Sequence, residues 1–309
     1  MKSNLVKFLI KVVFFLFLLF VVDSGIGILF VGLKDYGLIK NPENMWLKTP
    51  FVLEKVNSDI IIIGSSKASH HYIPQLIEDS LRLSVYNCGQ DGCFFLYQNC
   101  IINMILERYQ PKCIIWDIQP ESFTQVNKNF EYQNIRFLSP YYRNNKWAME
   151  YINGESFMMK YRMKSNMFAY NSKVLNYIFP LFSKNDMTLN GYLPLPNKGY
   201  DYPMLVVEKE SAYNSNLYFL EMLSNTIKRC VSLGVELHLF ISPVLSEKSN
   251  ASKSAELDIE AIATSHDISI HNYHSSKLFL DDVSLFKDMG HMNDKGAHLF
   301  TNQVICAIK

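Results

Sequence analysis

Short runs of strand-forming residues alternate with longer segments of helical periodicity along most of this chain. The clearest run is the four isoleucines at residues 60–63, a pattern typical of a strand buried on both faces. Further strands are predicted at residues 85–87, 112–118, 235–241 and 268–271. Helices are predicted at residues 73–83, 94–109, 214–233, 258–266 and 293–308. This alternation predicts an α/β domain in which helices cover both faces of a parallel sheet.

The chain begins with a long apolar stretch at residues 5–33, whose charged residues are Lys7, Lys11 and Asp23. A transmembrane helix needs about 20 such residues. The stretch lacks an A-x-A-like cleavage site, so an anchor is favoured over a removable signal peptide. Lysines lie at its start, and the positive-inside tendency therefore predicts a cytoplasmic N-terminus with the rest of the chain outside the cytoplasm, in the periplasm or at the cell surface.

Two positions of the membrane span are compatible with this stretch. A span over residues 12–33 places Asp23 near the middle of the bilayer, where a carboxylate costs about 3 kcal/mol and calls for a polar partner. A span over residues 5–22 lets Lys7 and Lys11 extend their ammonium groups toward the headgroups and leaves Asp23 outside the hydrocarbon.

The same pattern divides the chain into parts. We expect a cytoplasmic stub and anchor at residues 1–33, a polar tether at residues 34–57 and one main domain at residues 58–309. A long excursion rich in aromatic residues and methionine interrupts that domain at about residues 121–212. It is interpreted either as a helical insertion with a small core of its own or as a lid or substrate platform, in which Tyr192 and Tyr200 could stack on sugar rings.

Charge and cysteine content narrow the function classes. The net charge of +1, without a basic run in the exported part, argues against a nucleic-acid partner. The six cysteines are Cys88, Cys93, Cys100, Cys113, Cys230 and Cys306. An exported chain permits disulfides, but a domain of this size does not need them, and most of the cysteines are expected to be buried thiols. The eight histidines lack metal-ligand spacing, so neither a metal nor a cofactor is predicted.

Candidate catalytic residues stand at both ends of the main domain. Ser65 and Ser66 follow the first strand directly after Gly64, at the strand end where open α/β sheets place their chemistry. Asp288 and His291 precede the last helix, three residues apart. A serine, an aspartate and a histidine in this order offer a nucleophile, an orienting carboxylate and a base. A plain turn is the alternative interpretation of residues 64–66.

These residues resemble the motifs of the SGNH/GDSL hydrolases, in particular their exported, membrane-tethered branch, to which D-alanine transfer and alginate O-acetylation proteins belong. The family's first block, Gly-x-Ser, matches residues 64–66 and would make Ser66 the nucleophile, with Ser65 in place of the usual acidic residue. The D-x-x-H of the last block matches Asp288 and His291. The resemblance covers roughly residues 55–120 and 210–309, and it implies a three-layer, flavodoxin-like domain.

The resemblance also implies an oxyanion site. The backbone N–H groups of Ser66 and of a glycine in the second block would form it; that glycine matches Gly92, with Gly89 as the other option. The third block normally supplies an Asn after the third strand, but this chain has Trp-Asp-Ile-Gln-Pro at residues 116–120. Gln119 or a residue of the excursion is therefore predicted to contact the oxyanion or the substrate.

From this resemblance we expect a membrane-anchored extracytoplasmic serine esterase or O-acyltransferase. Its substrate would be a cell-envelope glycan or another acyl ester, handled through a seryl ester, and a multi-span membrane acyltransferase is a possible partner. The alternative is a non-catalytic assembly or scaffold protein of the envelope on the same fold, which the missing third-block Asn keeps open.

Overall fold

A five-stranded parallel sheet forms the centre of the protein. The computed structural model describes residues 2–124, 131–132, 134–171, 173–182, 188–197 and 214–309. The strands are β1 (Ile60–Ile63), β2 (Val85–Asn87), β3 (Cys113–Asp117), β4 (Glu236–Ile241) and β5 (Ser269–Asn272). Their order, β2-β1-β3-β4-β5, is that of flavodoxin-like folds, with the reversal of direction between β1 and β3. The predicted α/β class is confirmed, and every strand ends within one residue of its predicted limits.

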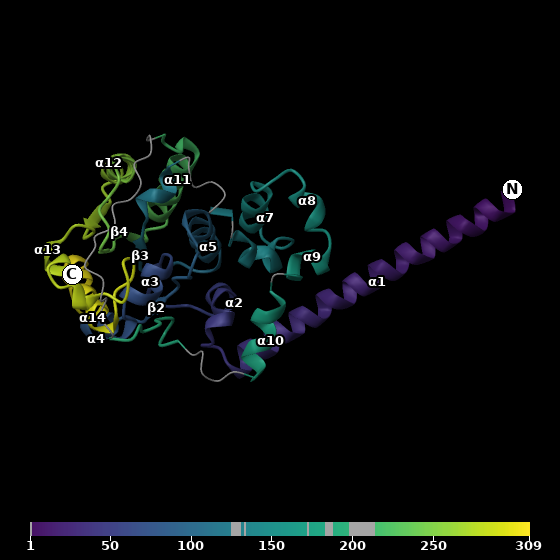
Figure 1. Ribbon diagram of the computed structural model, residues 1–309, viewed down its shortest axis with the longest axis horizontal. Helices are drawn as coiled ribbons and strands as arrows, with labels where there is room; N and C mark the ends of the chain where they lie inside the picture. Colours follow the sequence, from purple (N-terminus) through teal and green to yellow (C-terminus); the bar gives the residue numbers. More distant parts are fainter. Residues whose placement is uncertain (1, 125–130, 133, 172, 183–187, 198–213) are drawn as a thin grey trace.

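Helices cover both faces of the sheet (Figure 1). One layer consists of α5 (Phe95–Arg108), α11 (Leu217–Ser232) and α12 (Asn250–Thr264), and the other contains α3 (Ser66–His71), α4 (Pro74–Leu81) and α14 (Asp294–Ala307). In β1, Ile61 and Ile63 pack into the first layer, whereas Ile60 and Ile62 pack into the second. Since both faces are covered, the strand is apolar at every position and does not alternate.

Local capping sets the ends of several helices. Before α11, the side chain of Asn216 accepts the N–H of Phe219 at 3.3 Å, and after it Gly234 takes the positive φ of +69° that suits a helix end. Helix α12 begins eight residues before the predicted helix (residue 250 against 258), because Ser249 accepts the N–H of Ser252 at 3.1 Å and caps an extra pair of turns.

Residues 34–57, predicted as a polar tether, take a different form. Helix α1 (Lys2–Lys40) runs through the first part, and η1 (Met45–Leu47) and α2 (Lys48–Glu54) follow. Leu47, Val52 and Leu53 are buried in the core that also contains α5. The Lys34 ammonium pairs with Glu54, so this segment joins α1 firmly to the domain. The tether prediction overlooked these apolar positions.

The excursion is a set of short helices that share the core of the sheet. Its elements are η2 (Pro120–Phe123), η4 (Ile135–Tyr141), α7 (Lys146–Asn153), α8 (Met159–Arg162), α9 (Asn166–Asn171) and α10 (Val174–Phe182). Leu138, Ile152 and Met159 belong to the same buried cluster as α5 and α11. The described residues of the excursion therefore extend the main core.

The sugar-stacking interpretation of the excursion is wrong for Tyr192. Its ring is buried, and its hydroxyl donates to Asp294 Oδ1 at 2.7 Å, so its faces are covered by protein. Tyr200 lies outside the described residues.

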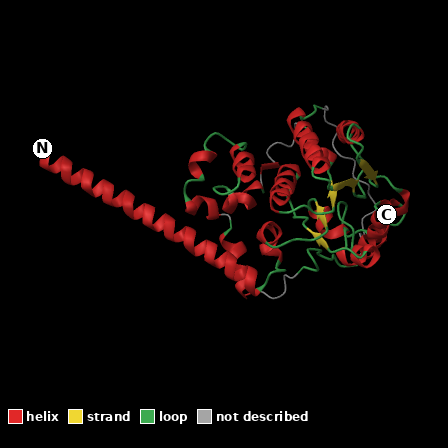
Figure 2. Cartoon of the chain, turned by 180° about the vertical axis from the view of Figure 1, so that it is seen from behind, coloured by secondary structure: helices red, strands yellow, loops and turns green. Residues whose placement is uncertain are grey.

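Helix α1 has two halves with different surroundings. The side chains of residues 5–22 are exposed, whereas the half from Asp23 onward packs against α9 and α10. Figure 2 shows the first half projecting from the folded part as a free rod. The helix is long and apolar enough to cross a membrane. It is thus a candidate membrane span.

The chain beyond β5 leads back to the sheet edge through α13 (Lys277–Leu280) and η5 (Val283–Leu285) before α14 begins. Asn293 caps α14 by accepting the N–H of Gly296 at 3.0 Å. Its amide also donates to the carbonyl of Ser284 at 2.6 Å. This cap fixes where the segment containing Asp288 and His291 ends.

Candidate active site

Ser66 stands at the first position of α3, at the carboxyl end of β1. The turn between them is tight: a Cβ added at Gly64 would lie 2.5 Å from the Cβ of Ala68 and 3.0 Å from that of Asp117. A residue with a side chain would push α3 away from the sheet. Glycine at position 64 therefore allows the serine to sit at the topological switch point between β1 and β3, where ligands bind in folds of this type.

The loop between η5 and α14 carries the other two candidate residues. Its ends meet in an isolated antiparallel bridge between Phe286 and Met292. Within it the N–H of Lys287 donates to the carbonyl of His291 at 2.9 Å, and the N–H of Leu245 donates to the carbonyl of Met289 at 2.8 Å. The loop is thus held both to itself and to the segment after β4.

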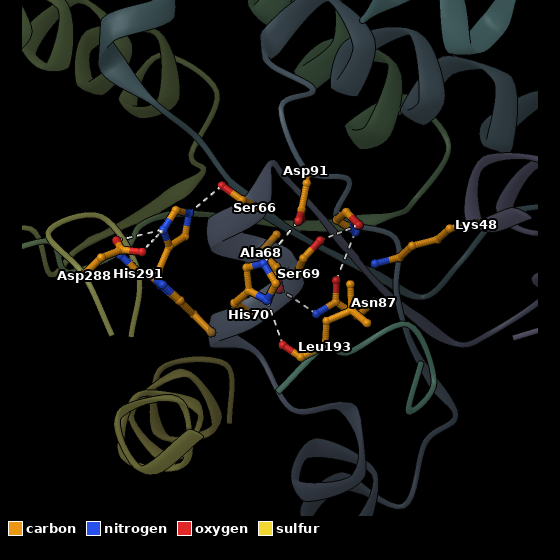
Figure 3. Close-up of polar contacts among 12 residues, drawn as sticks. Lys48, Ser66, Ala68, Ser69, His70, Asn87, Asp91, Leu193, Asp288 and His291 are labelled. Atoms are coloured by element: carbon orange, nitrogen blue, oxygen red, sulfur yellow. Dashed lines mark hydrogen bonds and ion pairs between the residues drawn. The ribbon is translucent and has the colours of Figure 1, made fainter. Parts of the chain in front are cut away.

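Ser66, His291 and Asp288 lie in a row (Figure 3). Ser66 Oγ is 2.8 Å from His291 Nε2, and His291 Nδ1 is 2.9 Å and 3.1 Å from the two carboxylate oxygens of Asp288. Asp288 Oδ1 also accepts the N–H groups of Gly290 and His291, each at 2.9 Å. The carboxylate can therefore hold the imidazole with Nδ1 protonated and Nε2 facing the serine, which is the tautomer a general base requires.

A buried histidine supports this loop from below. The Met292 N–H donates to Nε2 of His71, on α3, at 2.9 Å. Burial and the neighbouring His291 and His70 hold the pKa of His71 well below its usual value, so the ring is neutral and can accept this bond. The helix that presents Ser66 and the loop that presents His291 are thereby linked next to the reacting groups. No sequence signal distinguished His71 from the adjacent His70.

A buried carboxyl group lies under the serine turn. Asp117, the last residue of β3, accepts hydrogen bonds from the hydroxyls of Tyr72 (2.6 Å) and Ser242. Its other oxygen, Oδ1, is buried and makes no hydrogen bond with the described residues. Burial raises the pKa of Asp117 to about 6, with the nearby Lys67 charge and the two hydroxyls opposing the rise.

The two candidate oxyanion glycines differ in what their backbones do. The Gly89 N–H donates to Asn87 Oδ1 at 3.0 Å, and a Cβ at Gly89 would lie 2.6 Å from the backbone nitrogen of Ser69. Gly89 is thus used for close packing of the second strand's turn against α3. Gly92 has a φ of +68° in the loop that leads into α5, a backbone conformation that favours glycine.

Two side-chain amides contact the segments that contain Ser65 and Gly92. Gln119 Nε2 donates to Ser65 Oγ at 2.6 Å, one residue before the candidate nucleophile. Asn134, from the excursion, donates to the carbonyl of Gly92 at 2.8 Å. Sequence reasoning named Gln119 but could place no particular residue of the excursion, because the contact of Asn134 with Gly92 joins segments 42 residues apart.

A second histidine lies beside the row of three. The ring of His70 meets that of His291 edge-on with 5.7 Å between centroids. Its Nδ1 is 2.7 Å from the carbonyl of Leu193, and its Nε2 is 3.3 Å from Asp91 Oδ2. Figure 3 shows these groups on the side of Ser69 and Asn87, away from Asp288. His70 thus ties the excursion to the loop that carries Gly92.

The remaining predictions concern the six cysteines and His238, which lie outside the candidate active site. All six cysteines are described and are free thiols there; Cys306 is exposed and the other five are buried. His238 is a buried strand residue whose Nε2 is 2.8 Å from Glu236 Oε1. The ligand atoms of Cys113, Glu236 and His238 lie within 4.8 Å of one another, but at the amino ends of β3 and β4, opposite the serine.

Comparisons with known proteins give structural likenesses. No family profile and no curated protein matches the sequence. Among solved structures, a lipolytic protein of the G-D-S-L family from Desulfitobacterium hafniense is 11% identical, with a TM-score of 0.40 over 80% of this chain and 97% of that one. An acetyl xylan esterase is 10% identical, with a TM-score of 0.42 over 81% and 99%. An acylhydrolase from Bacteroides fragilis is 10% identical, with a TM-score of 0.40 over 81% and 86%.

The resemblance drawn from the motifs now has a spatial counterpart. Ser66 and His291 are 225 residues apart in the chain, yet they meet, together with Asp288, at one edge of the sheet. The serine, aspartate and histidine whose order in the sequence resembles that of the SGNH/GDSL hydrolases thus contact one another in the structure.

Proposed function

We propose that this protein is a membrane-anchored, extracytoplasmic serine esterase or O-acyltransferase that acts through a seryl-ester intermediate. The observation that carries the proposal is the contact of Ser66 Oγ with His291 Nε2 at 2.8 Å, together with the carboxylate of Asp288 on the other ring nitrogen. This is the arrangement by which a weakly nucleophilic hydroxyl is activated for attack on an acyl carbon.

The proposed reaction has two steps. His291 Nε2 takes the proton of Ser66 as Oγ bonds to the acyl carbon, and then gives that proton to the leaving alkoxide as the ester bond breaks. In the second step His291 takes a proton from water, giving hydrolysis, or from an acceptor hydroxyl, giving transfer, as that oxygen bonds to the acyl carbon; His291 then returns the proton to Ser66 Oγ as the bond between Oγ and the acyl carbon breaks. Asp288 stabilises the imidazolium in both steps.

Backbone N–H groups of Ser66 and Gly92 are proposed to stabilise the oxyanion. In related sites the loss of one such donor costs about 3–4 kcal/mol of transition-state stabilisation. Gln119, which donates to Ser65 Oγ, and Asn134, which donates to the carbonyl of Gly92, are the candidates that we propose for the missing third donor. Either amide would first have to release its present acceptor.

The anchor and the substrate class are part of the proposal. Residues 5–22 would span about 27 Å as a helix, close to the hydrocarbon thickness of a bilayer. Asp23 then lies at the outer surface, where Ser165 Oγ and two backbone N–H groups satisfy its carboxylate, which supports the span that excludes it. An enzyme held there would reach acylated cell-envelope glycans or other esters, and a multi-span acyltransferase in the same membrane could act as its acyl donor.

Labelling with a fluorophosphonate tests the chemistry. We expect the full chain to be labelled, and Ser66→Ala and His291→Ala to lose the label. Ser265→Ala, which removes an exposed serine at the end of α12, is the matched control and should be labelled as the parent is. A folded protein that takes no label would exclude the enzyme and support the alternative, a scaffold protein on the same fold.

A further inference from the structure

A patch of large apolar side chains is exposed on and around α8. Phe157, Met158, Tyr161 and Met167 have exposed fractions of 71%, 50%, 48% and 53%. Met159 and Met163 on the other side of this segment are buried in the core, so the segment has an inner and an outer apolar surface. Soluble surfaces seldom keep four such side chains together without a partner.

The same patch is basic. Residues 157–167 contain Lys160, Arg162 and Lys164, all exposed, and no acidic residue. The Lys160 ammonium lies 3.9 Å from the ring centroid of Phe157 and 5.1 Å from that of Tyr161, and Lys164 lies 5.6 Å from Tyr161. The nearest acidic side chain in the sequence, Glu155, is paired with Arg136. The Asp23 carboxylate, which accepts hydrogen bonds from Ser165, Asn166 and Met167, offsets part of this charge, and the three basic side chains leave the patch with a net positive charge.

The position of the patch along α1 is fixed by Asp23. The Asp23 carboxylate accepts Ser165 Oγ at 2.6 Å and the N–H groups of Asn166 and Met167 at 2.8 Å and 2.9 Å, so the start of α9 is held at the end of the exposed half of α1. Figure 1 shows α8 and α9 on the side of the folded part from which this half emerges. A bilayer around residues 5–22 would therefore end at the level of the patch.

We propose that this patch, defined by Phe157, Met158, Lys160, Tyr161, Lys164 and Met167, lies in the headgroup region of an anionic lipid bilayer. The inference rests on the proposed insertion of α1. Aromatic and apolar side chains flanked by lysines are the composition of interfacial helices, which sit about 5–10 Å into the headgroup and acyl boundary. Each lysine near an anionic surface strengthens such binding by about fivefold.

This contact would give the domain a second point of attachment to the membrane, and, because α1 already packs against α9 and α10, it would fix the tilt of the helix and domain relative to the bilayer. The carboxyl edge of the sheet, with Ser66, would then keep a constant distance from the membrane. A bilayer is favoured as the occupant because the patch is continuous with the candidate span and complementary in charge to acidic lipids.

The test places a fluorescent probe on the patch of the full chain in lipid nanodiscs. Cys306→Ser removes the exposed thiol, and Phe157→Cys then offers a labelling site for bimane. Leu257→Cys is the matched control, since Leu257 is a similarly exposed apolar residue, at 64%, on α12, far from α1 in both views. Lipids with a nitroxide near the headgroup serve as quenchers in discs of phosphatidylglycerol and phosphatidylcholine.

We expect quenching at position 157 to be several times stronger than at position 257. The double change Lys160→Glu with Lys164→Glu, or discs of phosphatidylcholine alone, should weaken it by about tenfold or more. Equal quenching at the two positions overturns the proposal, and so does quenching that ignores both charge reversal and lipid charge. Failure of the chain to enter nanodiscs would instead refute the anchor, and loss of fluorophosphonate labelling would refute the chemistry.

Discussion

Asp288 touches His291 twice, through the ring nitrogen and through the backbone N–H. Asp288→Asn keeps one acceptor but replaces the other oxygen by a donor, which favours the wrong imidazole tautomer. We expect the hydrolysis of p-nitrophenyl acetate to fall by about 10²–10⁴ in kcat, with little change in the unfolding midpoint because the side chain is half exposed. A variant that retains half of the parent activity would contradict the role given to this carboxylate.

For Asp117 we predict that substitution stabilises the protein. Its pKa of about 6 lies above the value near 3.9 expected in the unfolded chain, so between these two pH values the folded state binds more protons and loses stability as pH rises. Above pH 6 the full cost, about 3 kcal/mol as an upper figure, is present. Asp117→Asn should therefore raise the free energy of unfolding at pH 7.

The measurement is urea unfolding of both proteins at several pH values. The difference between Asp117→Asn and the parent should be small near pH 4 and grow to about 1–3 kcal/mol by pH 7. A difference that does not change with pH would show that burial of this carboxylate is compensated by groups other than Tyr72 and Ser242.

At the scale of elements, α3 and the loop before α14 are joined through His71. His71→Leu leaves the buried Met292 N–H without its acceptor, which should cost about 1–3 kcal/mol of unfolding free energy at neutral pH. It should also loosen the position of His291 relative to Ser66 and lower kcat by about tenfold or more. His298→Leu, an exposed histidine on α14, is the control and should change neither quantity much.

A second measurement compares how the stability of the parent and of His71→Leu changes as the pH falls. The pKa of His71 is depressed in the folded state, so its contribution is present above the unfolded pKa of about 6.5 and is lost as pH falls below that value. His71→Leu removes this term. Its stability should therefore decline less steeply than that of the parent below pH 6.5, and an equally steep decline would assign the acid sensitivity to other groups.

On the scale of the whole molecule, one carboxylate connects the candidate anchor to the excursion. Asp23→Ala removes the acceptor of Ser165 Oγ and of two N–H groups at the start of α9, a loss comparable to that of a helix cap, about 1–2 kcal/mol. We expect faster amide hydrogen exchange in α9 and unchanged exchange in α5. Asp281→Ala, an exposed aspartate after α13, serves as the control.

That prediction differs from the one a polar partner in the membrane would give. If Asp23 bound such a partner, Asp23→Ala would leave α9 as protected as before and would instead disrupt a complex in membranes. Unchanged exchange in α9 would thus favour the span over residues 12–33.

Much of the fold follows from local sequence alone. The isoleucine run of β1, the three residues of β2 and the amphipathic pattern of α5 specify their elements because period and length are properties of short segments. The order of Ser66, Asp288 and His291 along the chain, and their places next to a strand end and a helix start, were equally readable from the sequence.

The tertiary structure decided everything that depends on contacts between distant segments. It showed that the Gly89 N–H already donates to Asn87, it brought Asn134 to the loop before α5, and it gave His71 a role that the neighbouring His70 does not share. It also showed that residues 34–57 and the excursion belong to the main core. The sequence could not show this, because an apolar helix face indicates burial but does not identify the element that it packs against. For the same reason, the choice of Asp23 as the link between α1 and α9 appears only when residues more than 140 positions apart are seen together.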